Sequence, residues 1–118
     1  MSDNLQPAFA KLVKAAAGLP EVEESSWFGT PSLKVRGKGF ARVKDPDTVV
    51  LMCSLEDKEL LFETAPEIFF ETDHYKGWPA ILVRIKKISP KELKHRLAIA
   101  WRLKAPKKLA KQVEGGSV

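Results

Sequence analysis

The feature that most constrains the fold is a series of short β-rich segments separated by turn residues. Four of them precede residue 54: EVEESSW, the two arms of LKVRGKGFARVK, and VVLMC. GTPS and DPDT separate these segments, and glycines on both sides of Lys38 mark a hairpin tip between the two arms. Two more segments, EIFFET and AILVRIK, follow Pro66. The pattern predicts strands joined by tight turns.

The N-terminal segment has a different periodicity. Apolar residues recur at helical spacing over residues 3–17, which predicts a helix there. Ser2 or Asp3 is placed to cap its start, and Gly18 is placed to end it.

Further helices are predicted by their start signals. Ser54 precedes LEDKELLFET and is expected to be its N-cap. Ser89 precedes the clearest helical pattern, PKELKHRLAIAWRLK, in which Glu92 is expected to complete a capping box. Pro106 is expected to begin a short last helix. We therefore expect one α+β domain over residues 1–114 and a flexible tail over residues 115–118.

The net charge of +5 is distributed in blocks. Residues 34–44 carry five bases and no acid, residues 45–73 carry nine acids and one base, Lys58, and residues 84–111 carry eleven bases and one acid, Glu92. Such blocks favour charged faces over a mixed surface. The basic faces would attract a polyanion. The alternative is that the acidic and basic blocks neutralise each other, within one molecule or across a dimer.

Several classes of function lack a signal. The two histidines, His74 and His95, and the one cysteine, Cys53, are not at metal-ligand spacing, so we expect no metal and no cofactor. Cys53 lies in an apolar segment, where we expect a buried, unreactive thiol. No nucleophile–base set is visible, so we expect a protein that is not an enzyme. The lone cysteine and the lack of a membrane span or secretory signal favour a cytoplasmic protein.

The basic residues of the strands alternate with apolar ones. If the apolar side chains face the helices, six basic side chains share the open face of the sheet: Lys34, Arg36, Arg42, Lys44, Arg84 and Lys86. A face without acids suits a phosphate backbone. The alternative is a solubilising outer surface.

The segment TDHYKGW, which precedes AILVRIK, brings aromatic and basic residues together. We interpret it as the connection between two strands. Its His74, Lys76 and Trp78 would allow bases to stack beside positive charge. Trp78 could instead cover the end of the core.

Three blocks of the sequence resemble the MmcQ/YjbR-like family: WFGTPSLKVRGKGFARV, FFETDHYKGWPAILVRIKKIS and AWRLKAPKKLAK. The resemblance runs over residues 21–111 and keeps the order of the blocks. It implies a CyaY-like (frataxin-like) two-layer α/β sandwich, with an antiparallel sheet of about six strands and helices packed on one face. It also implies DNA binding with hairpins as wings. The iron handling of frataxin relatives does not carry over, because Asp3 is the only acid in the first helix.

Two hypotheses about function follow. The first is a nucleic-acid-binding module, for DNA with low sequence specificity, that uses the six basic residues together with Lys38, His74 and Lys76. The second is a binding module for a small anionic ligand or a protein, with a pocket between GTPS and HYKGW. That pocket would be lined by Trp27, Thr30, Ser32, Tyr75 and Trp78. The sequence gives no indication of an oligomeric state.

Overall fold

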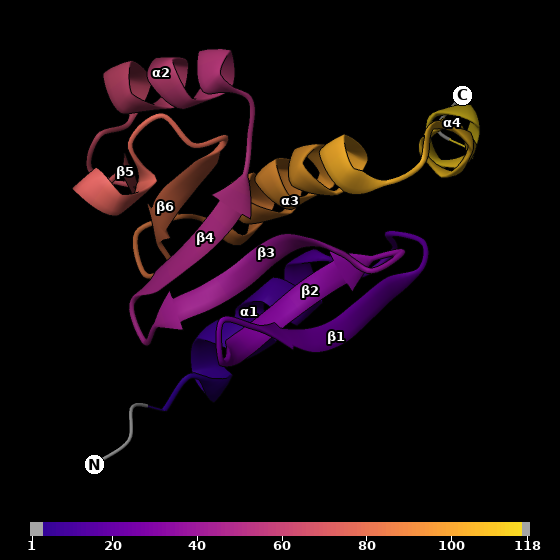
Figure 1. Cartoon of the computed structure of the whole chain (residues 1–118), viewed down its shortest axis with the longest axis horizontal. Helices are drawn as coiled ribbons and strands as arrows, with labels where there is room; N and C mark the ends of the chain where they lie inside the picture. The colour runs from indigo at the N-terminus through magenta and orange to yellow at the C-terminus, as the bar shows by residue number, and fades with distance from the viewer. Residues whose placement is uncertain (1–3, 117–118) are drawn as a thin grey trace.

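The computed structural model describes residues 4–116, which form one six-stranded sheet with helices packed against it (Figure 1). The strand order is β1-β2-β3-β4-β6-β5, and every neighbouring pair is antiparallel. The strands are β1 (Val22–Trp27), β2 (Thr30–Val35), β3 (Lys38–Asp45), β4 (Thr48–Met52), β5 (Phe69–Phe70) and β6 (Ala80–Arg84). The helices are α1 (Gln6–Ala15), α2 (Leu55–Thr64), the 3₁₀ turn η1 (Asp73–Tyr75), α3 (Pro90–Lys104) and α4 (Lys107–Gly116).

The helix starts follow the expected capping chemistry. The Ser54 hydroxyl accepts a hydrogen bond from the Asp57 amide at 3.1 Å, and the Ser89 hydroxyl accepts one from the Glu92 amide at 3.1 Å. The Glu92 carboxylate, however, accepts from Arg96 at 2.9 Å one turn later. The expected capping box at α3 is therefore formed in one direction only among the described residues.

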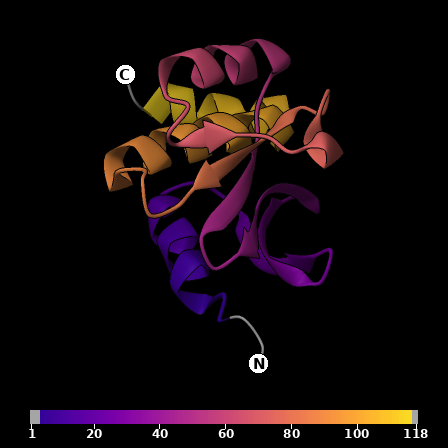
Figure 2. The ribbon, with the colours of Figure 1, turned by 90° about the vertical axis from the view of Figure 1, so that its left-hand side faces the viewer.

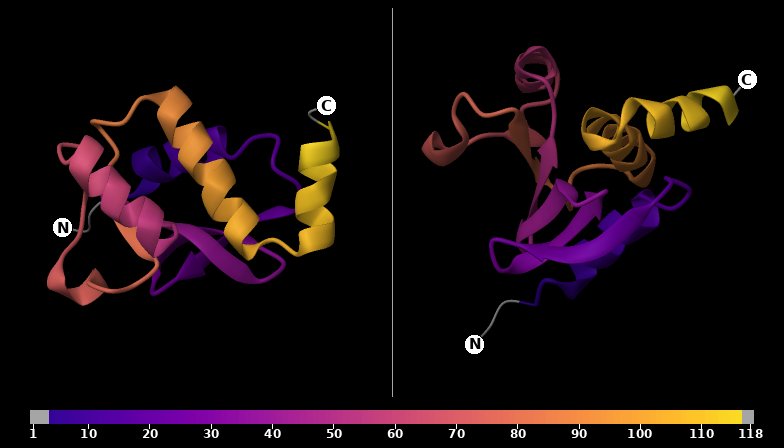
Figure 3. Two further views of the ribbon diagram at one scale, coloured as in Figure 1. Left: turned by 90° about the horizontal axis from the view of Figure 1, so that it is seen from above. Right: turned by 45° about the vertical axis from the view of Figure 1, so that its right-hand side comes forward.

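The main core lies between one face of the sheet and the pair α1 and α3. Figures 2 and 3 show both helices on the same side of the strands. Strand alternation sends Leu33, Val43 and Leu51 into this layer, where they are almost fully buried. Trp101 on α3 joins them and donates its indole N–H to the Pro20 carbonyl at 3.0 Å. The apolar face of α3 is thus part of the main core.

A second, smaller apolar cluster lies on the opposite face of the sheet. Val50 and Leu82, which are cross-strand partners on β4 and β6, are buried there together with Ala80 and Tyr75. Tyr75 belongs to the segment 72–79, which connects β5 to β6. We call this segment the cover loop, because it covers part of the sheet face opposite α1 and α3, which was expected to be open.

Some boundaries differ from those expected. Helix α1 is shorter than residues 3–17, and its first turn is supported by the Asn4 side chain, which accepts from the Gln6 amide. The proposed caps at residues 2 and 3 lie outside the described residues. Strand β5 is reduced to two residues. Helix α4 continues to Gly116, into the segment expected as a tail, and residues 117–118 lie outside the described part.

Candidate nucleic-acid interface

The turn between β1 and β2 presents an exposed aromatic ring. Phe28 and Gly29 form its two central positions, and both have positive φ, +55° and +77°. This geometry is that of a two-residue hairpin turn, in which Asn or Gly is the favoured residue. A phenylalanine at positive φ is strained, by about 1 kcal/mol or more. Its side chain is nevertheless 74% exposed, and it stacks on Trp27 with ring centroids 5.6 Å apart.

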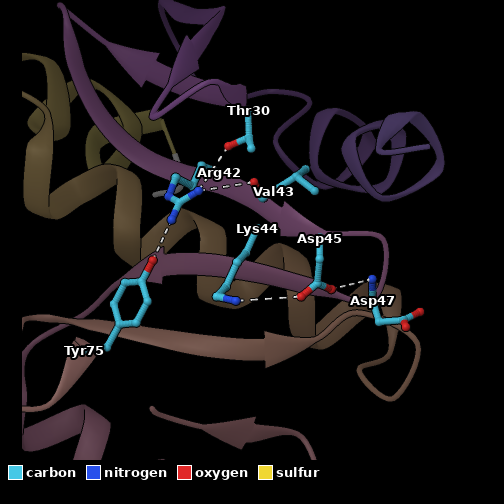
Figure 4. A network of polar contacts seen from close by, with 7 residues as sticks. All are labelled: Thr30, Arg42, Val43, Lys44, Asp45, Asp47 and Tyr75. Carbon is cyan, nitrogen blue, oxygen red and sulfur yellow. Dashed lines mark hydrogen bonds and ion pairs between the residues drawn. The ribbon is translucent and has the colours of Figure 1, made fainter. Parts of the chain in front are cut away.

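Arg42 lies next to this ring. It also connects two distant segments, because it contacts both Thr30 and Tyr75 (Figure 4). Its guanidinium carbon is 5.3 Å from the centre of the Phe28 ring. One terminal nitrogen donates to the Thr30 hydroxyl at 3.1 Å, and the other donates to the Tyr75 hydroxyl at 2.6 Å. A long contact of 3.5 Å to the Val43 carbonyl completes its bonds within the described residues. A guanidinium has five N–H groups, so part of its donor capacity is left for a ligand.

The cover loop adds a second exposed ring. Trp78 is 54% exposed, so it does not serve mainly to close the core. It stacks with His74, with ring centroids 6.4 Å apart and planes inclined by 20°. His74 in turn meets the edge of Tyr75 at 5.1 Å. A continuous series of contacts therefore runs from Phe28 through Arg42 and Tyr75 to Trp78. We call these residues, with His74, the aromatic–Arg42 surface.

Lys58 on α2 holds the cover loop in place. Its side chain is only 4% exposed, and its ammonium donates to the carbonyls of Tyr75 at 2.8 Å and Trp78 at 2.9 Å. It also forms an ion pair of 2.7 Å with Glu71. An ammonium has three N–H donors, and these three partners account for them. The buried lysine thus fixes both ends of the turn that carries Tyr75 and Trp78.

The six basic side chains expected to share the open face of the sheet lie in different surroundings, and several of them have partners within the chain. Arg36 lies in the β2–β3 turn at φ +50° and is bound by both carboxylate oxygens of Glu21. These hydrogen bonds lower the pKa of Glu21 and raise that of Arg36. Arg84 is on the open face, but its guanidinium lies 4.1 Å from the centre of the Phe70 ring. Both arginines are therefore engaged within the chain.

The lysines of the expected row are also divided. Lys86 follows the end of β6 and forms a 2.8 Å ion pair with Asp47, a hydrogen bond that raises the pKa of the lysine. Its side chain lies near α1, on the helix side of the sheet. Lys44 sits at a register shift, 3.9 Å from Asp45. Lys34 lies between buried neighbours and projects to the open face, opposite Glu23 on β1. The alternation rule fails where strands end or bulge, and it does not count acids on neighbouring strands.

Of the remaining predicted contact residues, Lys38, His74 and Lys76 are exposed. Lys38 begins β3 beside the β2–β3 turn, whereas His74 and Lys76 lie on the cover loop. The structure thus places His74 and Lys76 beside Trp78 and leaves Lys38 on the wing formed by the β2–β3 hairpin.

The predicted pocket between GTPS and HYKGW is occupied by a side chain. The two segments do come together, because Thr30 and Tyr75 bind opposite ends of the Arg42 guanidinium. The guanidinium fills the space between them. Ser32, the cross-strand partner of Arg42, is fully buried, and its hydroxyl has no hydrogen-bond partner among the described residues. Trp27 is half-buried and lies against Gly39.

Cys53 is buried, as expected, and burial raises its pKa to about 11. Within residues 4–116 no three His, Cys, Asp or Glu side chains are grouped so as to hold a metal ion. In the same range no helix has the length and apolar character needed to cross a membrane.

Two residues of this site were missed at the sequence level. Phe28 precedes a glycine, and an aromatic residue in a two-residue turn is unusual enough to have been a signal. Lys58 is the single base in the acidic block 45–73, and this isolation was the available signal. Its neighbours in the sequence do not predict that its ammonium is buried and bound to the cover loop.

Comparisons with known proteins give a family but no activity. The family model described as YjbR matches residues 17–103. Uncharacterized proteins of Mycobacterium tuberculosis and Mycobacterium bovis are 38% identical over 52 residues, which is 44% of this chain and 40% of theirs. The chain thus matches less than half the length of these curated relatives. No solved structure matches significantly.

Proposed function

The chain belongs to the YjbR family, which is the MmcQ/YjbR-like family, and from this premise we propose that it binds single-stranded nucleic acid without strong sequence preference. The binding surface is the aromatic–Arg42 surface, extended by the exposed Lys38 and Lys76 and by the half-buried Lys34. The partner of choice is DNA, and the role is one of binding without catalysis.

The observation that carries this proposal is the pair of exposed rings linked through Arg42. Phe28 and Trp78 are large apolar side chains that are 74% and 54% exposed. A ligand that covers these rings would remove their apolar surface from water, which is favourable. Nucleobases stack on such rings, whatever their sequence, and are stabilised by about 1–3 kcal/mol per base. The strain at Phe28 supports the same view, since strained residues concentrate at functional sites.

The electrostatics favour a modest number of phosphate contacts. Arg36, Arg84 and Lys86 are engaged within the chain, so they contribute less than their number implies. Lys34, Lys38 and Lys76 have no ion pair among the described residues. For single strands each phosphate contact contributes about 0.7 to the slope of log affinity against log salt. Removing these three lysines should therefore flatten the slope by about 2.

The test is fluorescence anisotropy with a labelled oligo-dT of 12 nucleotides and a matched duplex, at several salt concentrations. Phe28→Asn is the most informative variant. It places the favoured residue in the turn, so the fold should be as stable as the parent or more so, by up to about 1 kcal/mol. Single-strand affinity should still fall by about 5- to 150-fold.

Trp78→Ala should weaken binding to a similar degree. Lys107→Gln with Lys108→Gln is the matched control, because these exposed lysines lie on α4, outside the proposed surface. The proposal fails if the parent does not bind oligo-dT at low salt. It also fails if Phe28→Asn and Trp78→Ala bind as the parent does, or if the α4 control loses as much affinity as they do.

A second candidate is a small anion bound at Arg42. The observation that favours it is the buried, unpaired Ser32 hydroxyl on the strand next to Arg42. A mononucleotide or phosphate that binds tightly, and whose affinity is lost in Arg42→Met but kept in Phe28→Asn, would support this function over the first.

A further inference from the structure

A cavity of about 590 Å³ lies on the helix side of the molecule, away from the aromatic–Arg42 surface. It is bounded by α1, by the connection between β6 and α3, and by the first turn of α3. Figure 2 shows this connection, in orange, beside the indigo helix α1. The volume is within the range of sites that hold small ligands, about 300–1,000 Å³.

The floor of the cavity is apolar. It is formed by side chains that also belong to the edge of the main core: Ala15, Ile85, Ile88, Pro90 and Leu93. Ile85 and Leu93 are only 2% and 3% exposed, so the floor is fixed by the packing of the domain. An apolar ligand group placed here would be removed from water against a preformed surface.

The rim of the cavity is cationic. Five lysines contribute to it: Lys11 and Lys14 from α1, Lys86 from the connection, and Lys91 and Lys94 from α3. No acidic residue is found among the described residues that line the cavity. Lys86 is paired with Asp47 at 2.8 Å, and the nearby Glu92 is directed to Arg96 at 2.9 Å. The other four lysines have no ion pair among the described residues.

Four like charges around one apolar floor repel each other when the cavity is empty, and an anion at the rim relieves that repulsion. The long lysine stems can lie along the apolar wall while their ammonium groups reach the mouth. The first turn of α3 adds the positive end of its helix dipole. Charge and shape are therefore complementary to a molecule with an apolar body and one anionic head.

We propose that this cavity binds a small amphipathic carboxylate, with the hydrocarbon part on the Ile85–Leu93 floor and the carboxylate among the lysines. The site is separate from the nucleic-acid surface, and the proposal does not depend on it.

The test is isothermal titration of the full chain with decanoate below its micellar concentration. Inorganic phosphate probes the head group alone, and decyltrimethylammonium probes the tail with the opposite charge. Decanoate should bind at least about tenfold more tightly than either. It should also shift the amide resonances of residues 85–94. Equal affinity for decyltrimethylammonium would mean that the lysines do not select the ligand, and equal affinity for phosphate would mean that the floor contributes nothing. Either result overturns the proposal.

The variant Lys14→Glu with Lys94→Glu should lower decanoate affinity by at least about tenfold. Both side chains are exposed, and an unchanged urea midpoint will show that the variant folds. Lys107→Glu with Lys108→Glu makes the same change of net charge on α4 and should leave the affinity within about twofold. Phe28→Asn should also leave it unchanged, so a failure of the nucleic-acid proposal is distinguishable from a failure of this one. Equal losses in the two lysine variants, or resonance shifts confined to residues 72–79, would refute the site.

Discussion

Replacing Lys58 by Met should destabilise the protein strongly, because this lysine is the main link between α2 and the cover loop. Met keeps the length, the apolar stem and the helical preference of the side chain but removes the ammonium. Three acceptors then lose their donor: the carbonyls of Tyr75 and Trp78, at 2.8 Å and 2.9 Å, and the Glu71 carboxylate at 2.7 Å.

The size of the effect follows from the solvent access of these acceptors. Removing one partner of a fully buried ion pair costs about 3–5 kcal/mol. Here the Glu71 side chain is 27% exposed, and a cavity of about 270 Å³ borders Lys58 and Glu71, so water can partly replace the ammonium. We therefore expect a loss of about 2–4 kcal/mol in the free energy of unfolding, of the roughly 6–18 kcal/mol typical for a chain of this length.

Urea denaturation followed by far-UV circular dichroism measures this loss. Lys107→Met on α4 is the control, since replacing an exposed lysine should change stability by no more than about 0.5 kcal/mol. Lys58→Met with Glu71→Gln should be more stable than Lys58→Met alone, because it no longer leaves a carboxylate without its cation. Hydrogen exchange of residues 75–80 should accelerate in the single variant. A loss below about 1 kcal/mol, or a double variant no better than the single one, would refute this account of Lys58.

Three further changes test the packing. A Cβ at Gly39 would lie 2.6 Å from Cε3 of Trp27, so Gly39→Ala should displace the indole and shift the tryptophan fluorescence. The free energy of unfolding should fall by about 1–3 kcal/mol, and adding Trp27→Leu should restore part of it. Ser32→Ala removes a buried hydroxyl that has no partner among the described residues, so the urea midpoint should stay the same or rise. A loss above about 1 kcal/mol in the free energy of unfolding would contradict this expectation. Burial raises the pKa of Cys53 from its ordinary value of 9.0 to about 11, so between these pH values the folded state keeps a thiol proton that the unfolded chain loses. The contribution of this thiol to stability should therefore be full below about pH 9 and decline towards pH 11, and Cys53→Ala should show a smaller alkaline decline than the parent.

The sequence predicted those parts of the fold that depend on near neighbours. Ser54 and Ser89 cap their helices because an N-cap needs only an amide two or three residues away. The hairpin after Val35 forms as expected, but its tip is Arg36–Gly37, and Lys38, which was expected at the tip, already pairs with Val35. The inner face of β4 follows from alternation, with Val49 and Leu51 in the main core.

The outer face of the sheet was predicted less well, for a physical reason. Val50 and Leu82 are apolar on that side too, and a strand that is apolar on both faces indicates cover on both. The cover comes from the cover loop, which has no periodicity, and whose anchor, Lys58, acts over a distance of 17–20 residues. No local pattern encodes such a contact, so the loop was interpreted only as a connection.

Long-range contacts also explain why the sequence predicted basic surfaces but not which basic residues lack an ion pair. Ion pairs such as Arg36–Glu21 and Lys86–Asp47 join residues far apart in sequence, so counting charges along one strand overstates the free positive charge on the sheet. The lysines without such partners are found on the hairpin wing, the cover loop and the rim of the helix-side cavity. A lysine or arginine without an ion pair in the chain is a better candidate for binding an anionic ligand than one already paired with a carboxylate. The paired cation must share or give up its carboxylate when the ligand binds, so it gains less free energy. By this criterion Lys76 beside Trp78, and Lys14 and Lys94 above an apolar floor, are the cations to test first.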